Sequence, residues 1–282
     1  MSEINTYVEQ CLKKGIIQRW PDAAMPIKVY IAPFNWHEKA KQAQAPLYRQ
    51  VVLDSLQEWQ KATNGRVKFQ IVPRLDASQI DIKWRRVDRQ SLGHCVRETN
   101  GNNQIFSCAI EIGISDGVLH KAYNHMDEVR HTIIHEIGHA LGLEHSPNKA
   151  DIMYVPHEYG VYRLSACDIT TIDWMYQLPV GFNAAKVAAK YKLPSNATMD
   201  DLLEAIAREK QNPQARQEVD FVKPKKEPVE DSGLIRKPKS LDEQHDILSE
   251  MGRFHLKTQH LRLNNGGGGM PQQPPPGMLP PF

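Results

Sequence analysis

The stretch from His135 to Tyr154, HEIGHALGLEHSPNKADIMY, constrains the fold of this chain more than any other. His135 and His139 stand four residues apart, so on a helix they lie one turn apart on the same face. Gly142 stands where such a helix would end, and glycine adopts the positive φ of a sharp turn at low cost. The turn would bring His145 back towards the first two histidines.

Three imidazoles that meet at one point have the chemistry of a catalytic zinc site. Neutral imidazole is a good ligand for Zn²⁺, and three protein ligands leave the fourth tetrahedral position for water. Glu136 follows the first histidine directly, so its carboxylate can reach that water without binding the metal. The pattern therefore predicts one catalytic zinc ion held by His135, His139 and His145, with Glu136 as the catalytic residue.

An amphipathic core helix with surface histidines is the alternative interpretation of these residues. A bare H-E-x-x-H pattern arises by chance on the order of a few per cent of the time in a chain of this length. Gly142 and His145 at fixed offsets make a chance match far rarer, so the zinc site is favoured.

The same residues carry a family resemblance. HEIGHALGLEH matches H-E-x-x-H-x-x-G-x-x-H, and the Ile-Met-Tyr at 152–154 is similar to the Met-turn of the metzincin clan of zinc endopeptidases. Ser146 and the Ile-Met-Tyr spelling most resemble the matrixin branch, the matrix-metalloproteinase-like enzymes. The resemblance extends over about residues 26–178. It implies that Met153 forms a hydrophobic floor beneath the metal.

The resemblance implies a zinc-dependent metalloendopeptidase that hydrolyses peptide bonds inside a protein or peptide. In this hypothesis a zinc-bound water attacks the scissile carbonyl, while Glu136 takes the water proton as general base and returns it to the leaving amine. One alternative is a catalytically silent zinc-binding regulatory protein with the same fold, and another is an enzyme with a non-peptide substrate. The presence of Glu136 argues against the silent protein.

The periodicity over residues 26–178 predicts a mixed α/β (α+β) domain. Residues 26–33, 67–72 and 79–84 alternate as strands do, and residues 46–63 carry one apolar helical face. This order is typical of a sheet with a crossover helix. The resemblance implies the metzincin form of the fold, a twisted, mostly parallel sheet with an antiparallel edge strand, an active-site helix and a C-terminal helix.

Two helices are expected around the motif. The active-site helix should start near Asp127, where acidic side chains favour its positive end. Ser165-x-x-Asp168 is a capping box that opens the final helix. The buried stripe expected on the active-site helix has five members: Val129, Ile133, Ile137, Ala140 and Leu141.

Residues 91–98 and 104–114 flank a short turn and predict a hairpin. In matrixins the strand that corresponds to 91–97 is the sheet edge along the cleft, so the resemblance implies that a protein or peptide substrate binds there in extended form. His94 resembles a histidine that helps to bind a second, structural zinc in matrixins. Neither the preceding loop nor residues 110–113 supply the other ligands, so we predict no second zinc and treat His94 as a strand residue.

The segments beside the motif extend this picture. The resemblance implies that residues 155–164 line the pocket for the side chain just beyond the cut bond, with Tyr159 and Tyr162 as candidates for its wall. His131 lies one turn before His135 and is either a fourth ligand or a histidine with other partners. Three imidazoles already complete the site, which favours the second interpretation. The same interpretation applies to three further histidines: His120, His125 and His157.

The rest of the chain divides by composition. Residues 1–25 place Ile4, Tyr7, Val8, Cys11 and Leu12 at helical spacing and are expected to form an N-terminal helical extension. Residues 179–212 suggest a short helical appendage, whose second helix opens with the capping box Thr198-x-x-Asp201. Residues 213–282 form a Pro/Gly/Lys/Glu-rich tail that we expect to be largely disordered, and the tail could bind a partner.

Charge and composition bear on partners and compartment. The net charge of +2 gives no argument for nucleic acid or an anionic membrane as a partner, and no apolar run approaches the ~20 residues that span a bilayer. The N-terminus does not resemble a secretory signal peptide, which favours a cytoplasmic location, while export by another route and an extracellular location stay open.

The four cysteines form no C-x-x-C pair. Cys95 and Cys108 fall on neighbouring predicted strands and could form a disulfide in an oxidising compartment. Free thiols are favoured because no signal peptide is evident. Matrixins are typically kept inactive by a propeptide cysteine bound to the zinc, and the sequence around Cys11 does not resemble that setting.

Overall fold

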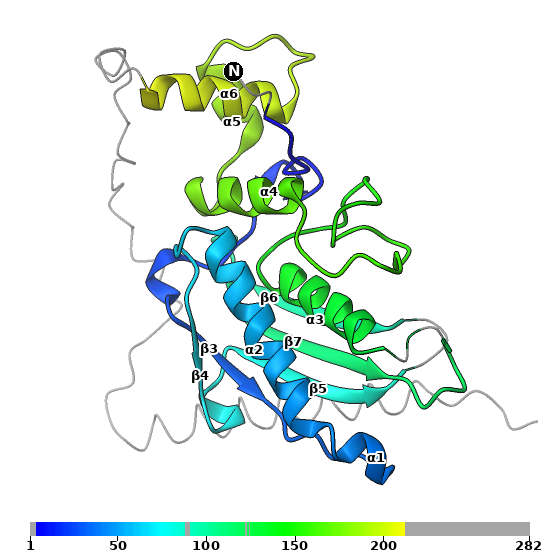
Figure 1. Ribbon diagram of the computed structural model, residues 1–282. Helices are drawn as coiled ribbons and strands as arrows, with labels where there is room; N and C mark the ends of the chain where they lie inside the picture. The colour runs from blue at the N-terminus through cyan, green and yellow to red at the C-terminus, as the bar shows by residue number, and fades with distance from the viewer. Residues whose placement is uncertain (1–3, 88–90, 122, 124, 212–282) are drawn as a thin grey trace, which may run out of the picture. The chain divides into compact units, whose positions relative to one another are not determined.

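A five-stranded sheet forms the base of the domain in the computed structural model, with strand order β4-β3-β5-β7-β6 (Figure 1). The strands are β3 (Ile27–Ile31), β4 (Phe69–Ile71), β5 (Ile80–Arg86), β6 (Gly93–Thr99) and β7 (Ile105–Ile114). All neighbours pair in parallel except β6, which pairs antiparallel with β7 at the sheet edge. The predicted mixed α/β sheet with an antiparallel edge strand is confirmed. The structure describes residues 4–87, 91–121, 123 and 125–211.

Two long helices, α2 (Ala45–Ala62) and α3 (Met126–Ala140), pack against each other on the sheet (Figure 1). The helix expected over residues 46–63 is therefore confirmed. The Trp59 indole Nε1 of α2 donates a hydrogen bond of 3.0 Å to the Ile134 carbonyl of α3. The whole predicted stripe of α3, from Val129 to Leu141, is buried. The opposite face of α3 carries His135 and His139. Shorter helical segments are α1 (Lys39–Gln42) and the 3₁₀ turns η1 (Asp22–Ala24) and η2 (Leu75–Ala77).

The final helix of the domain, α4 (Ala166–Gln177), begins at the predicted capping box. The Ser165 hydroxyl accepts from the Asp168 backbone N–H at 2.9 Å, and the Asp168 carboxylate accepts from the Ser165 N–H at 2.8 Å. These bonds satisfy two donors that a helix start otherwise leaves unpaired.

The helix expected near the N-terminus is wrong for the described residues 4–25. One turn with i→i+3 bonds forms around Val8, and the chain then makes a small hairpin from β1 (Leu12–Lys13) and β2 (Ile16–Ile17). Lys14 and Gly15 join the strands with φ values of 53° and 76°. Two consecutive positive φ values suit a two-residue hairpin loop and are incompatible with a continuing helix.

This N-terminal segment is part of the core. Tyr7, Val8, Ile17 and Trp20 are each at most 1 % exposed. The Tyr7 hydroxyl donates to Asp168 Oδ1 at 2.7 Å, which ties the segment to the start of α4. The apolar spacing in residues 4–12 thus reflects burial against the domain. A single turn gives the same spacing of apolar residues as a short helix does.

Helices α5 (Ala184–Lys190) and α6 (Met199–Gln211) follow the domain, as expected for residues 179–212. The Thr198 hydroxyl accepts from the Asp201 N–H at 3.2 Å, so the predicted capping box is present. The Thr6 hydroxyl also donates to Asp200 at 2.5 Å, so the appendage contacts the N-terminal segment. The tail predicted to be largely disordered, residues 213–282, lies outside the described residues. Within the described part, no helix is long and apolar enough to cross a membrane.

Candidate metal centre

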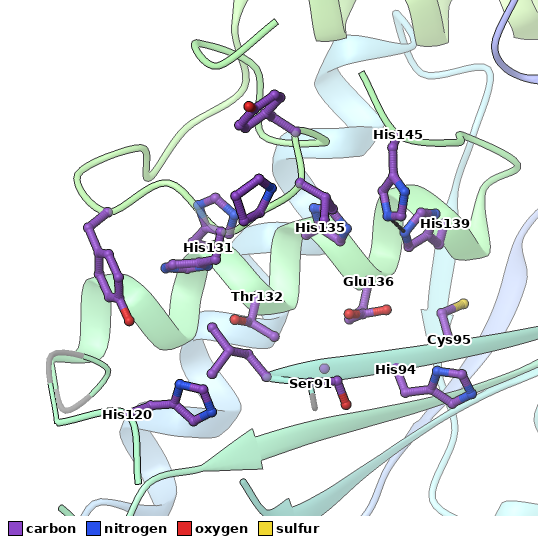
Figure 2. A pocket seen from close by; sticks show the side chains of 17 residues that line it. Ser91, His94, Cys95, His120, His131, Thr132, His135, Glu136, His139 and His145 are labelled. Atoms are coloured by element: carbon purple, nitrogen blue, oxygen red, sulfur yellow. Dashed lines mark hydrogen bonds between the residues drawn. The ribbon is translucent and has the colours of Figure 1, made fainter. Parts of the chain in front are cut away.

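Helix α3 presents His135 and His139 one turn apart (Figure 2), and the chain then reverses at Gly142. Gly142 has a φ of +109°, and a Cβ there would lie only 2.5 Å from the Gln18 carbonyl oxygen. A side chain would therefore be strained by both its backbone angle and its surroundings. The reversal brings His145 against the first two histidines, as the sequence predicts.

Three distant side chains stabilise this reversal by binding carbonyls at the C-terminal end of α3. Trp20 Nε1 donates to the Ala140 carbonyl at 2.8 Å, and the Tyr176 hydroxyl donates to the Leu141 carbonyl at 3.0 Å. Arg97 Nη1 donates to the His139 carbonyl at 2.7 Å. A helix end leaves such acceptors unpaired, so these residues make a buried, sharp stop possible. Sequence analysis missed all three, because no local motif marks a partner so far away in the chain.

The three histidines fit a tetrahedral metal site. One nitrogen from each of His135, His139 and His145 lies within 4.8 Å of the other two, and the Nε2 atoms of His139 and His145 are 3.2 Å apart. Two ligands about 2.05 Å from a tetrahedral zinc ion stand roughly 3.3 Å from each other. The nitrogen spacing and the all-imidazole donor set therefore suit Zn²⁺.

Hydrogen bonds to the backbone orient the first two rings. His135 Nδ1 lies 2.8 Å from the Ile152 carbonyl oxygen, and His139 Nδ1 lies 2.9 Å from the Leu143 carbonyl oxygen. Because a carbonyl only accepts, each Nδ1 carries the proton and each Nε2 keeps a free lone pair. Burial lowers the pKa of both rings to about 3, so both are neutral at pH 7.

The Ile152 backbone that orients His135 is itself held in place. Its N–H donates to Asp168 Oδ2 at 2.9 Å, and Asp168 Oδ1 accepts from the Tyr7 hydroxyl. A continuous set of bonds thus runs from Tyr7 through Asp168 and Ile152 to the first candidate ligand. The capping box in the sequence indicates that Asp168 caps a helix, but nothing in the sequence shows that Asp168 also binds the Ile152 N–H.

Met153 lies where the resemblance implies a hydrophobic floor. It is fully buried, and a Cβ on Gly138 of α3 would lie 2.5 Å from its sulfur. The Met153 carbonyl also accepts from the Ser146 N–H at 2.9 Å, which joins the Met-turn to the residue after His145. Met153 therefore supports the helix beneath the histidines.

Glu136 lies between the histidines and the edge strand β6 (Figure 2). A Cβ on Gly93 of β6 would collide with Glu136 Oε1, so only glycine lets the strand pass this close. Burial raises the pKa of the Glu136 carboxyl to about 8, and the charge of Arg85 opposes part of that shift. A carboxyl with a pKa near neutrality is suited to proton transfer at physiological pH.

A pocket of about 530 Å³ opens beside these residues. One wall comes from β6 and the loop before it, and the other from α3 and the segment after the Met-turn. Tyr159 lines the pocket, whereas Tyr162 donates to Glu128 at 3.1 Å and is not a lining residue. Besides the three candidate ligands and Glu136, the lining residues are Ser91, Leu92, Gly93, His94, Cys95, His120, His131, Thr132, Tyr154, Val155, Pro156, His157 and Tyr159.

A second set of histidines lies next to the candidate ligands. His131 Nδ1 is 2.7 Å from the Val161 carbonyl oxygen, and His157 Nε2 is 2.8 Å from Glu128 Oε2. The two rings have centroids 4.0 Å apart. His131 thus has a backbone partner on one nitrogen, and it is not in the three-histidine group that could hold a metal among the described residues.

The remaining sequence candidates have other positions. His94 is exposed on β6 opposite Glu111, and it lines the pocket rather than joining the three histidines. Cys95 and Cys108 are separate thiols with Sγ atoms 3.1 Å apart. Cys11 is buried, and its sulfur accepts from the Glu144 N–H at 3.4 Å.

Comparison with known proteins agrees with this geometry. The model of the Matrixin family matches residues 32–177. Macrophage metalloelastase of Rattus norvegicus is 48 % identical over 50 residues, which are 17 % of this chain and 11 % of that protein. "Probable matrix metalloproteinase 095L" of Invertebrate iridescent virus 3 is 40 % identical over 50 residues, 18 % of this chain and 14 % of that protein. The chain spans only a small part of either relative's length. Because the family model covers slightly more than half of its residues, the chain belongs to the matrixin family of zinc metalloproteases.

Proposed function

We propose that this protein is a zinc-dependent metalloendopeptidase that cleaves peptide bonds within proteins or peptides. One observation carries the proposal: the converging nitrogens of His135, His139 and His145 lie beside a buried glutamate at the edge of a sheet. The family match supports the reaction class. The small overlap with each curated relative leaves the substrate open.

In this proposal the three histidines hold one zinc ion. When bound, Zn²⁺ polarises the scissile carbonyl and lowers the pKa of water from about 15.7 towards 7. Glu136 removes a proton from the attacking water and delivers it to the leaving amine. Burial raises the pKa of the Glu136 carboxyl in the metal-free protein, and a zinc ion beside it would lower that pKa, which would leave the carboxylate free to accept a proton.

In this proposal an extended substrate binds along the edge strand β6. Its pairing with β7 uses one side of the strand, and among the described residues the other side has no strand neighbour. An extended peptide could therefore add to the sheet through main-chain hydrogen bonds. The approach of Gly93 to Glu136 would place the scissile bond close to the general base.

The test uses the full chain, purified and loaded with zinc. We expect it to cleave casein or members of a peptide library, and expect a chelator to abolish cleavage. Glu136→Gln should keep zinc while cleavage falls by about 10²–10⁴-fold or more. A catalytically silent zinc protein predicts zinc binding without cleavage in the parent protein. Wild-type activity in Glu136→Gln would contradict the role of Glu136.

A further inference from the structure

Arg97 lies on β6, the strand that lines the pocket, and its side chain reaches the candidate metal centre. Nη1 donates to the His139 carbonyl at 2.7 Å and to the Leu143 carbonyl at 3.0 Å. Nη2 pairs with the Glu144 carboxylate. A single guanidinium therefore holds both sides of the turn that leads from α3 to His145.

The Leu143 carbonyl gives this contact its chemical meaning. That oxygen also lies 2.9 Å from His139 Nδ1, so it orients the second candidate ligand. Arg97 fixes the position of the oxygen, and the oxygen fixes the ring. Partners of this kind, one step removed from a metal, set the direction in which the free nitrogen points.

The surroundings make Arg97 difficult to replace by water. Its side chain is 16 % exposed, whereas its partner Glu144 is 41 % exposed. Loss of the guanidinium would remove one hydrogen bond from each of two carbonyls at a tight turn. The His139 carbonyl would keep the Gly142 N–H, and among the described residues the Leu143 carbonyl would keep only His139 Nδ1, the contact that Arg97 supports. Gly93 and Arg97 also fix β6 to α3 at two points, one beside Glu136 and one beside His139.

We propose that Arg97 is a positioning residue that couples the pocket-lining strand β6 to the metal centre through the Leu143 carbonyl. In this proposal Arg97 acts through the turn and is not itself a ligand. It sets the orientation of His139 and the path of the turn to His145. This inference rests on the proposed zinc site, but it concerns metal retention and can be measured without a substrate.

The experiment compares the zinc affinity of folded protein by competition with a chromophoric chelator. We expect Arg97→Met to bind zinc about 10- to 100-fold more weakly than the parent, as is usual when a partner of a metal ligand is removed. Arg97→Lys, which keeps the charge but loses the fork of donors, should fall between the two. With Co²⁺ as a spectroscopic probe, the visible bands of Arg97→Met should shift because the ligand geometry changes.

Arg130→Met is the matched control. Arg130 also joins a carbonyl and a carboxylate, Tyr162 O at 3.2 Å and Glu58 at 2.6 Å, and it lies on α3 itself. Its loss should reduce stability and leave zinc affinity unchanged. At saturating zinc, Arg97→Met should also lower kcat more than it raises KM.

A folded Arg97→Met protein with parental zinc affinity and Co²⁺ spectrum would overturn the inference and leave Arg97 a purely structural role. If Arg97→Met does not fold, Arg97→Lys decides the question, and parental zinc affinity in that variant counts against the proposal. If the parent binds zinc tightly but cleaves nothing, the proposed peptidase activity fails while the role of Arg97 stands. If the parent binds no zinc, both fail.

Discussion

Helix α3 carries His131, His135 and His139 at one-turn spacing, and these residues belong to two sets of histidines that differ in their partners. The candidate ligands His135 and His139 meet His145 across the Gly142 turn. One turn earlier, His131 meets His157, with the rings of His131 and His135 stacked 6.0 Å apart between centroids. The two sets therefore form one row of imidazoles along the pocket.

The difference lies in the third member of each set. In the first set it is another imidazole, so three neutral nitrogens can converge on a cation. In the second set it is Glu128, buried and bonded to His157 Nε2 and the Tyr162 hydroxyl. Helical spacing places histidines on one face, but their partners decide which rings can serve as ligands. His145 comes from beyond the helix, whereas Glu128 lies on α3 itself and binds His157.

The most direct way to break this comparison is to remove one histidine from each set. His139→Ala should weaken zinc binding by more than about 100-fold, because removing a ligand costs more than removing a ligand's partner. Peptidase activity should be lost with the metal. Zinc content after dialysis, measured by elemental analysis, checks the first effect.

His131→Ala is the counterpart and should keep zinc. Any change in cleavage by this variant should come from the shape of the pocket that His131 lines. Equal loss of zinc from both variants would show that His131 is a ligand after all.

The sequence predicted the features that depend on local spacing, and it did not predict partners from distant segments. Spacing within one element was sufficient to place His135, His139 and Glu136 on one helix and to predict the α4 capping box and the strands, because these depend on local periodicity. The pairing of β6 with β7 was also predictable from a short turn. The family match bears out the fold and family resemblance.

Partners from distant segments were not predictable. Trp20, Arg97 and Tyr176 reach the end of α3 from three other parts of the chain, and only the tertiary fold brings them together. The prediction of an N-terminal helix was wrong for a related reason. One turn of apolar spacing looks the same for a helix and for a segment pressed onto a core, and the Lys14–Gly15 loop decides between them.

Glu128→Ala sharpens the comparison through stability. The variant removes the buried carboxylate that accepts from His157 Nε2 and from the partly exposed Tyr162 hydroxyl. We expect the free energy of unfolding of the metal-free protein to fall by about 1–3 kcal/mol. Denaturant titration measures this, and zinc affinity at a temperature where the variant is folded should match the parent. Loss of zinc together with stability would show that the two sets act as one.

The last expected effect concerns the pH dependence of the metal-free protein. Burial lowers the pKa of His131 to about 4, and the charge of His157 adds to the shift. In the unfolded chain the pKa is about 6.5, so between these values the unfolded state binds a proton that the folded state refuses. The contribution of His131 is present above pH 6.5 and is lost as the pH falls towards 4, by up to about 3 kcal/mol.

Neighbouring groups titrate in the same range, so a difference measurement is needed. His135 and His139 have pKa values lowered in the same direction, whereas the raised pKa of Glu136 favours the folded state on acidification. His131→Phe removes one titrating ring and leaves these groups in place. The free energy of unfolding of the parent minus that of the variant should decline between pH 6.5 and 4. If this difference does not change with pH, His131 is protonated equally in the folded and unfolded states. The second set of histidines would then be exposed to water.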